Sequence, residues 1–250
     1  MTPDAAQLVA KLSTGRQLLR RVRLIWVGLM GLGTHPSQAS ANTWAMTAAG
    51  QQSIVTLDLE GVLVPEIWIA VAERTGIEAL RRTTRDEPDY DVLMNYRLEL
   101  LGRHGLTLSA IKEVIAGLSP LPGAVAFLDE LRCRTQVVIL SDTFEQFAQP
   151  LMRQLKWPAI MCHRLVVDND RIVGYQLRMP DPKRAAVEAL QSLNYRVVAA
   201  GDSFNDTSML LAAHAGFLFH APANVQAQFP QLPSLDHFDD LLEQITAALQ

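Results

Sequence analysis

The sequence is poor in cysteine, carries no excess of basic charge and lacks an apolar run long enough to cross a membrane. Its two cysteines, Cys133 and Cys162, cannot form a disulfide framework, and neither has the spacing of a thiolate metal site. We expect both to be packing residues. The net charge of -4 gives no basic footprint of the kind that nucleic-acid-binding proteins carry. These features favour a protein with neither a nucleic-acid nor a membrane partner.

The N-terminal segment differs from the rest of the chain in its charge. Residues 1–45 are net basic, and their apolar stretch Leu24–Gly33 falls short of the roughly 20 residues that a membrane helix needs. With Ala39–Ala41 behind it, the segment is also similar to a secretory signal. We favour instead a start codon placed too early, because Met46 lies just ahead of the first predicted strand. We therefore expect residues 1–50 to be poorly ordered and dispensable, and the protein to be cytoplasmic.

Three apolar runs are each followed by polar residues, and we predict that all three are buried strands of a parallel sheet. The runs are Ile54–Leu57, Val137–Leu140 and Val197–Ala200, and buried parallel strands are typically continuous in this way. Open sheets of this class bind ligands beyond the carboxyl ends of their strands. The polar residues after the runs are therefore expected at one edge of the sheet: Asp58, Ser141, Asp142, Asp202, Asn205 and Asp206.

A lysine between the second and third runs completes a set of groups suited to phosphoryl transfer. Pro182 fits the first turn of a helix, so Lys183 would project from that turn. A carboxylate nucleophile can split the displacement of a phosphate monoester into two easier steps, and Asp58 would be that nucleophile. Ser141 and Lys183 would neutralise the remaining phosphate oxygens, which is usually the largest contribution to catalysis.

Glu60 and a metal ion would supply the rest of the chemistry. Glu60 lies two residues after Asp58 on the same extended segment, so it points the same way. It could protonate the leaving oxygen and then deprotonate the acceptor. Mg²⁺ prefers oxygen ligands, including one or two carboxylates and the phosphate itself. We expect the magnesium site to draw on Asp58, Glu60, Asp202 and Asp206.

Four motifs occur in a fixed order along the chain: Asp58-Leu59-Glu60-Gly61, Ser141, Lys183 and Gly201-Asp202-x-x-x-Asp206. This order resembles the haloacid-dehalogenase-like phosphohydrolase superfamily from about Ile54 to the C-terminus. The chain departs from that family at two positions. Glu60 replaces the usual Asp of the acid/base position, and Val62 stands where Thr or Ser is common. The longer side chain of Glu60 alters the expected geometry of proton transfer.

The segment from Asp58 to Trp68 looks like the bacterial bifunctional phosphoserine phosphatase/homoserine phosphotransferase group. That resemblance implies a magnesium-dependent enzyme that hydrolyses phosphoserine and hands the phosphoryl group to homoserine in place of water. It implies that Glu66 binds the amino group of phosphoserine and Arg97 its carboxylate, as a zwitterionic substrate requires. It also implies contacts to phosphate or substrate from Ser141, Asp142, Lys183 and Asn205. The resemblance continues through Thr84–Asp86, Pro88–Asp91, Leu140–Phe144, Gln149–Leu155, Gly174–Arg178 and Phe219–Pro222.

The predicted fold is α/β, with a Rossmann-like, doubly wound parallel sheet, an inserted helical cap and a small β-hairpin flap. Residues 51–65 and 119–250 would form the catalytic core, and residues 66–118, which show helical spacing, would form the cap. Helices are expected from Pro122 to Arg134 and from Asp142 onward. The flap is expected within Leu165–Leu177, where apolar residues flank turn-forming ones.

Several alternatives remain open from the sequence. Asp206 could be a first-turn acid that stabilises its helix or supports a metal ligand, and Ser203 could be a plain N-cap. The enzyme could act on another small phosphomonoester, because fold does not name a ligand. A phosphate-binding module impaired by Glu60 is a further candidate. Dehalogenation, which needs no metal, is disfavoured by Asp202 and Asp206, and a homo-oligomer is compatible with the sequence.

Overall fold

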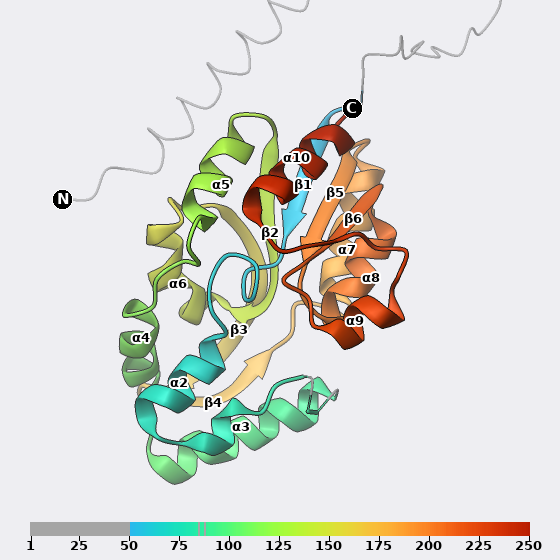
Figure 1. Ribbon diagram of the computed structural model, residues 1–250. Coiled ribbons are helices and arrows are strands. Elements are labelled where there is room, and N and C mark those ends of the chain that lie inside the picture. Colours follow the sequence, from blue (N-terminus) through green and yellow to red (C-terminus); the bar gives the residue numbers. More distant parts are fainter. Residues whose placement is uncertain (1–50, 85, 88) are drawn as a thin grey trace, which may run out of the picture. The chain divides into compact units, whose positions relative to one another are not determined.

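The structure is a computed structural model that describes residues 51–84, 86–87 and 89–250 (Figure 1). Our expectations for residues 1–50 lie outside this range. No helix of the described part is long and apolar enough to cross a membrane. The elements are β1 (Ser53–Leu57), α2 (Ile67–Thr75), the 3-10 helix η1 (Glu78–Arg81), α3 (Tyr90–His104), α4 (Leu108–Ala116), α5 (Ala124–Arg132), β2 (Gln136–Phe144), α6 (Glu145–Gln154), β3 (Ala159–Asp168), β4 (Arg171–Gln176), α7 (Pro182–Ser192), β5 (Arg196–Gly201), the 3-10 helix η2 (Phe204–Asp206), α8 (Thr207–Ala212), β6 (Ala215–Phe219), α9 (Ala223–Gln228), β7 (Ser234–Leu235) and α10 (Phe238–Ala248).

A seven-stranded sheet in the order β4-β3-β2-β1-β5-β6-β7 forms the centre of the fold. Strand β1 pairs in parallel with β2 on one side and with β5 on the other. The chain therefore winds outward from β1 in both directions, and the switch in strand order lies at β1. This confirms the predicted doubly wound α/β class and puts the end of β1 where such sheets bind ligands.

Both faces of the sheet are buried along its central strands β1 and β5, as their continuous apolar runs predict. Along β1 the side chains alternate, so Val55 and Leu57 enter one core and Ile54 enters the other. The first core includes Phe127 of α5 and residues of α6 and α10, whereas the second includes Val187 of α7 and residues of α8 and α9. Strand β1 is thus held from both sides, which fixes the position of the residue that follows it.

Helices α2, α3 and α4, together with η1, are inserted between β1 and α5, as predicted for the cap. They lie beyond one end of the sheet, near β4 (Figure 1). Ile67, Val71 and Leu100 from these helices are buried in the same core as Val55. The cap is therefore packed onto one layer of the catalytic core. Helix α2 ends at Gly76, whose φ of 72° is the left-handed conformation that glycine adopts without strain.

Strands β3 and β4 form the predicted hairpin. They pair in antiparallel fashion around Asn169 and Asp170, whose φ angles of 46° and 66° suit a tight two-residue turn. Strand β3 has a second role that the sequence did not indicate. Its first half pairs in parallel with β2, so one strand belongs to the central sheet at Ala159 and to the hairpin at Asp168.

Two local predictions need correction. Helix α6 begins at Glu145 and not at Asp142, because β2 continues through Ser141, Asp142 and Thr143 to Phe144 with a register shift against β3. The sequence predicts a helix from Asp142 onward, yet the backbone stays extended there. Cys133 is exposed and so is not a core packing residue, whereas Cys162 is partly buried.

Candidate active site

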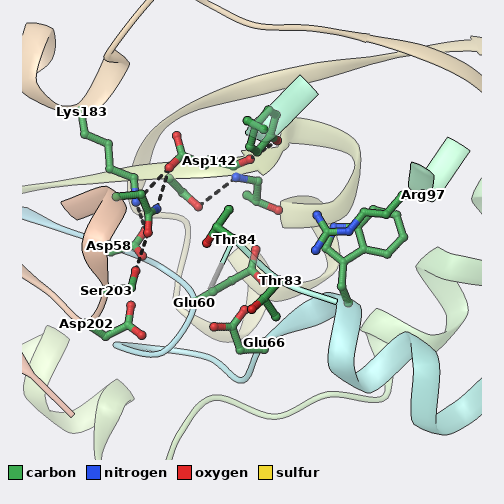
Figure 2. Close-up of a pocket in the computed structure, with 15 residues that line it drawn as sticks. Asp58, Glu60, Glu66, Thr83, Thr84, Arg97, Asp142, Lys183, Asp202 and Ser203 are labelled. Atoms are coloured by element: carbon green, nitrogen blue, oxygen red, sulfur yellow. Dashed lines mark hydrogen bonds and ion pairs between the residues drawn. The ribbon is translucent and has the colours of Figure 1, made fainter. Parts of the chain in front are cut away.

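One pocket gathers nearly all of the predicted site residues at the carboxyl end of β1 (Figure 2). Asp206 is the one predicted member outside its lining, and it lies fully buried against that lining. Figure 2 shows Lys183, Asp58 and Asp202 on one side of the pocket and Arg97 on the other. The lining residues are Asp58, Glu60, Glu66, Trp68, Thr83, Thr84, Tyr90, Arg97, Ser141, Asp142, Thr143, Lys183, Asp202, Ser203 and Asn205.

We divide the site into two groups. The strand end comprises residues that lie in the carboxyl-terminal part of β2, shortly after β1 or β5, or in the first turn of α7: Asp58, Ser141, Asp142, Lys183, Asp202 and Asp206. The cap end comprises Glu60, Glu66, Trp68 and Arg97, which lie on or against α2 and α3.

Lys183 is the centre of the strand end. Its Nζ lies 3.0 Å from Asp58 Oδ1, 3.4 Å from Asp142 Oδ2 and 2.7 Å from Asp206 Oδ1. Burial by itself would lower the pKa of Lys183, but the three carboxylates outweigh burial and raise it. Pro182 is the first residue of α7, as predicted, so the lysine leaves the first turn of that helix and reaches all three acids.

Asp58 is buried and is held at the end of β1 by a backbone hydrogen bond from its N–H to the carbonyl of Ala200. Burial raises the pKa of Asp58, repulsion from Asp206 raises it further, and Lys183 opposes both. An ionised carboxylate at this position is poorly solvated and close to one cation. Such a group suits attack on an electron-poor centre.

Asp206 shapes the loop that follows β5. Its Oδ2 accepts hydrogen bonds from the backbone N–H groups of Asp202 at 3.0 Å and Ser203 at 3.1 Å. Ser203 caps η2 in a reciprocal capping box with Asp206, which confirms the N-cap interpretation of Ser203. Both oxygens of Asp206 are therefore engaged, one by Lys183 and one by the loop.

Three buried carboxylates could hold a cation. Asp58, Asp202 and Asp206 each offer one oxygen, and the three oxygens lie within 4.8 Å of one another. Glu60 is not part of this group. Gly61, at φ 78°, leaves room for the Asp202 carboxylate, because a Cβ at position 61 would lie 2.5 Å from the Asp202 carboxyl carbon. All-oxygen ligands of this kind suit a hard divalent cation.

Asp142 is braced on several sides within the strand end. Asn205 donates to its Oδ2 at 2.8 Å, and His163 Nε2 lies 3.5 Å from its Oδ1. His163 Nδ1 accepts the backbone N–H of Arg178, which directs the Nε2–H toward Asp142. Burial would raise the pKa of Asp142, but Lys183, His163 and Asn205 outweigh burial and lower it. Asp142 therefore stays ionised beside Lys183.

The cap end carries two glutamates and one arginine. Glu60 Oε2 accepts the backbone N–H of Ile67 at 2.8 Å, and burial, reinforced by Glu66, raises the pKa of Glu60 to about 7. Glu66 occupies the N-cap position of α2. Arg97 on α3 is buried, and burial lowers its pKa to about 10. Its Nη2 donates to the carbonyl of Arg82 at 2.9 Å, whereas its Nε has no hydrogen-bond partner among the described residues.

The sequence did not single out several residues of the lining. Trp68, Thr83 and Thr143 carry no motif signal of their own, and Tyr90 appeared only inside a longer matching stretch. Tyr90 donates its hydroxyl to the backbone carbonyl of Asp142 at 3.0 Å, which ties the start of α3 to β2. Only the folded chain brings these residues to the pocket.

Comparison with known proteins agrees with this geometry. Residues 47–214 match the haloacid dehalogenase-like hydrolase family. The chain is 64% identical over 196 residues to the phosphoserine phosphatase ThrH of Pseudomonas aeruginosa, covering 78% of this chain and 96% of that protein. It is 63% identical over 196 residues to a phosphoserine phosphatase of Pseudomonas syringae pv. tomato, covering 78% and 83%. A substrate-bound phosphoserine phosphatase structure shares the fold, with a TM-score of 0.66 at 18% identity over 78% of this chain and 99% of that chain.

Proposed function

Because this chain belongs to the haloacid dehalogenase-like hydrolases, we propose that it is a magnesium-dependent phosphoserine phosphatase that can also transfer the phosphoryl group to homoserine. The observation that carries the proposal is the content of one pocket. A buried Asp58–Lys183 pair at 3.0 Å lies at the strand end, and at the cap end lies a buried arginine whose Nε has no hydrogen-bond partner within the described part of the chain. The names of the two Pseudomonas relatives support the same substrate.

In the first step, an Asp58 oxygen attacks phosphorus and the bond from phosphorus to the serine oxygen breaks. Glu60 gives its proton to the departing serine oxygen. Lys183 and Ser141 offset the charge on the phosphate oxygens, and Asp142 and Asp206 hold Lys183 in place. The product of this step is a phosphoryl group on Asp58.

In the second step, a water oxygen attacks the same phosphorus and the bond to Asp58 breaks. Glu60, now ionised, takes the proton from the attacking water. The enzyme returns to its starting state and releases inorganic phosphate. Glu60 thus acts as an acid and then as a base, while Asp58 forms the covalent bond to phosphorus.

Magnesium would be held by Asp58 and Asp202, with Asp206 close enough to contribute. When bound, it supplies positive charge between the anionic nucleophile and the anionic phosphate. Asp206 already uses its oxygens for Lys183 and for the loop, so its main role is to orient Asp202 and Lys183. Glu60 lies outside the three-carboxylate group and serves proton transfer.

The cap end would recognise the amino acid part of the substrate. Glu66 pairs with the ammonium group, and the Nε of Arg97, with a neighbouring Nη, donates to the carboxylate. Asn205 and Ser141 complete the contacts to the phosphate. A zwitterion held in this way places its phosphate over Asp58.

Homoserine as an acceptor follows from the same contacts. It carries the same ammonium and carboxylate as serine, with one more methylene before the hydroxyl. Transfer to homoserine is the reverse of the first step, with the homoserine hydroxyl in place of the serine hydroxyl. An alcohol that fits the cap end can therefore replace water as the group that attacks phosphorus. The family resemblance of the motifs supports this acceptor.

The decisive experiment supplies the full chain with Mg²⁺ and phosphoserine, with and without homoserine. We expect phosphate release that is partly diverted to phosphohomoserine when homoserine is present. Phosphate release that homoserine does not divert would contradict the proposed transferase activity and leave the proposed phosphatase activity standing. Phosphoserine binding without turnover would indicate an impaired binding module, and neither binding nor turnover would indicate another substrate.

A further inference from the structure

The surroundings of Arg97 are unusual for a buried cation. Among the described residues, no carboxylate forms an ion pair with Arg97, although the residue is only 6% exposed. Its guanidinium carbon lies 4.6 Å from the centre of the Trp68 ring, and Nη1 contacts the sulfur of Met94 at 3.7 Å. A buried charge is normally paired, because desolvation without a partner is costly. The π-face of Trp68, together with the Arg82 carbonyl that accepts from Nη2 at 2.9 Å, therefore supplies part of the stabilisation that an acidic partner would usually give.

Two acidic side chains lie close enough to compete for Arg97. Glu60 and Glu66 line the same pocket, and both attract the guanidinium and so raise its pKa against the effect of burial. A guanidinium free to move toward either glutamate would form an ion pair there. That pair would occupy the donors that a ligand carboxylate needs, and it would also use the acid that binds the ammonium group.

Trp68 is placed to prevent this movement. It lies in the first turn of α2, two residues after Glu66, and is itself 8% exposed. Its ring packs edge-on against Phe147, with 5.5 Å between ring centres, so it cannot easily follow the arginine. Contact with a flat ring leaves the rim of a guanidinium, where the N–H groups are, accessible to other acceptors. Figure 2 shows the Arg97 guanidinium directed toward the interior of the pocket.

We propose that Trp68 is a positioning residue that holds the Arg97 guanidinium with its donor edge toward the pocket, and thereby sets the preference for phosphomonoesters bearing a carboxylate. This inference depends on the proposed function, because it assigns the substrate carboxylate to Arg97. Trp68 does not touch the reacting atoms. Its effect is on recognition and not on the chemical step.

The test compares two substrates that differ by one group. Phosphoethanolamine has the phosphate and the ammonium of phosphoserine but no carboxylate. In Trp68→Leu, we expect KM for phosphoserine to rise about tenfold or more, as loss of a desolvated cation–π contact implies. We expect kcat for phosphoserine to change little, and kcat/KM for phosphoethanolamine to stay within about twofold of wild type, since that substrate makes no use of Arg97.

Two further variants separate positioning from folding. Trp68→Phe keeps a flat ring and should recover most of the phosphoserine KM. Trp157→Leu removes a tryptophan that is 62% exposed and lies outside the pocket, so it should match wild type for both substrates. Because phosphoethanolamine turnover is measured on the same preparation, it also reports the folded, active fraction.

The outcomes distinguish this inference from the function on which it depends. A wild-type enzyme that does not turn over phosphoserine would overturn the proposed function, whereas one that turns over phosphoserine and phosphoethanolamine equally well would overturn this inference alone. A wild-type preference that Trp68→Leu retains would overturn the role of Trp68 alone. An equal loss of both substrates in Trp68→Leu, not restored by Trp68→Phe, would reduce Trp68 to a structural residue and likewise contradict the proposal.

Discussion

The strand end and the cap end of the pocket differ in how completely their buried cations, Lys183 and Arg97, are paired with other described residues. At the strand end, Lys183 contacts three carboxylates and Asp206 uses both oxygens. At the cap end, Arg97 is buried, its Nε has no partner among residues 51–84, 86–87 and 89–250, and its guanidinium lies over an aromatic ring. The strand end is therefore organised before any ligand arrives, whereas the cap end leaves hydrogen-bonding capacity for one. We infer that the first fixes the reaction and the second selects the substrate.

Removal of the nucleophile should separate catalysis from stability at the strand end. We expect Asp58→Asn to lose at least about a thousandfold in phosphoserine turnover, as is typical for a nucleophile. Burial and Asp206 raise the pKa of Asp58, so the ionised form costs stability at any pH above the ordinary range of an aspartate. The neutral variant should therefore unfold in EDTA at pH 7 at the same or a higher temperature than wild type. Residual turnover near the wild-type rate would contradict the covalent mechanism.

Arg97→Lys should break the cap end and leave the strand end intact. Lysine keeps the charge but cannot offer two parallel donors to a carboxylate. We expect kcat/KM for phosphoserine to fall about 10- to 100-fold, in line with the loss of a charged hydrogen bond, with kcat/KM for phosphoethanolamine unchanged. Arg103→Lys, at an exposed site on the same helix, is the matched control. A parallel loss for both substrates would place Arg97 in the reaction itself.

Two glycines allow the effect of crowding at the strand end to be separated from the effect of backbone strain. Gly61 and Gly76 have φ angles of 78° and 72°, but a Cβ at Gly61 would meet the Asp202 carboxylate while one at Gly76 would meet nothing within 4 Å. Each change to alanine should cost about 1–2 kcal/mol of folding stability, because both force a left-handed residue. Only Gly61→Ala should also raise the Mg²⁺ concentration needed for half-maximal activity. Equal magnesium requirements in the two variants would show that Asp202 tolerates the added methyl group.

Of these predictions, we expect the smallest effect for the change in folding stability when Mg²⁺ binds. Mg²⁺ at about five times its dissociation constant should stabilise the folded protein by about 1 kcal/mol, because only the folded state has the site. Thermal unfolding with and without Mg²⁺ would measure this. Asp202→Asn should remove the shift, whereas Arg97→Lys should keep it, since Arg97 belongs to the cap end. A shift that survives in Asp202→Asn would move the metal away from the three-carboxylate group.

Much of the strand end could be predicted from the sequence, because its residues follow apolar strands and topology brings the ends of parallel strands together. The turn-forming residues Asn169 and Asp170 likewise predict the hairpin from local sequence. The course of β2 could not be predicted, since the strand passes through Ser141, Asp142 and Thr143 within a register shift and pairs again with β3 only at Phe144.

The cap end was predictable only through resemblance. Glu66 and Arg97 carry no local pattern that separates a ligand-binding residue from a surface charge. Trp68 gave no signal, because a tryptophan in an apolar helix face reads as core, and here it is both core and pocket wall. His163 belongs to no motif, and its contact with Asp142 depends on the dual pairing of β3. Such roles arise from contacts between distant parts of the chain.

The position of β1 between β2 and β5 has a consequence for how the enzyme comes into being on the ribosome. Asp58 is synthesised early, but one of the strands beside it and its partners Lys183 and Asp206 are made much later. Long-range parallel pairing of this kind is slow to form. A nascent or truncated chain that ends before α7 therefore holds a nucleophile without its cation Lys183 and without the loop that follows β5. We therefore expect an incompletely translated chain to have no catalytic activity.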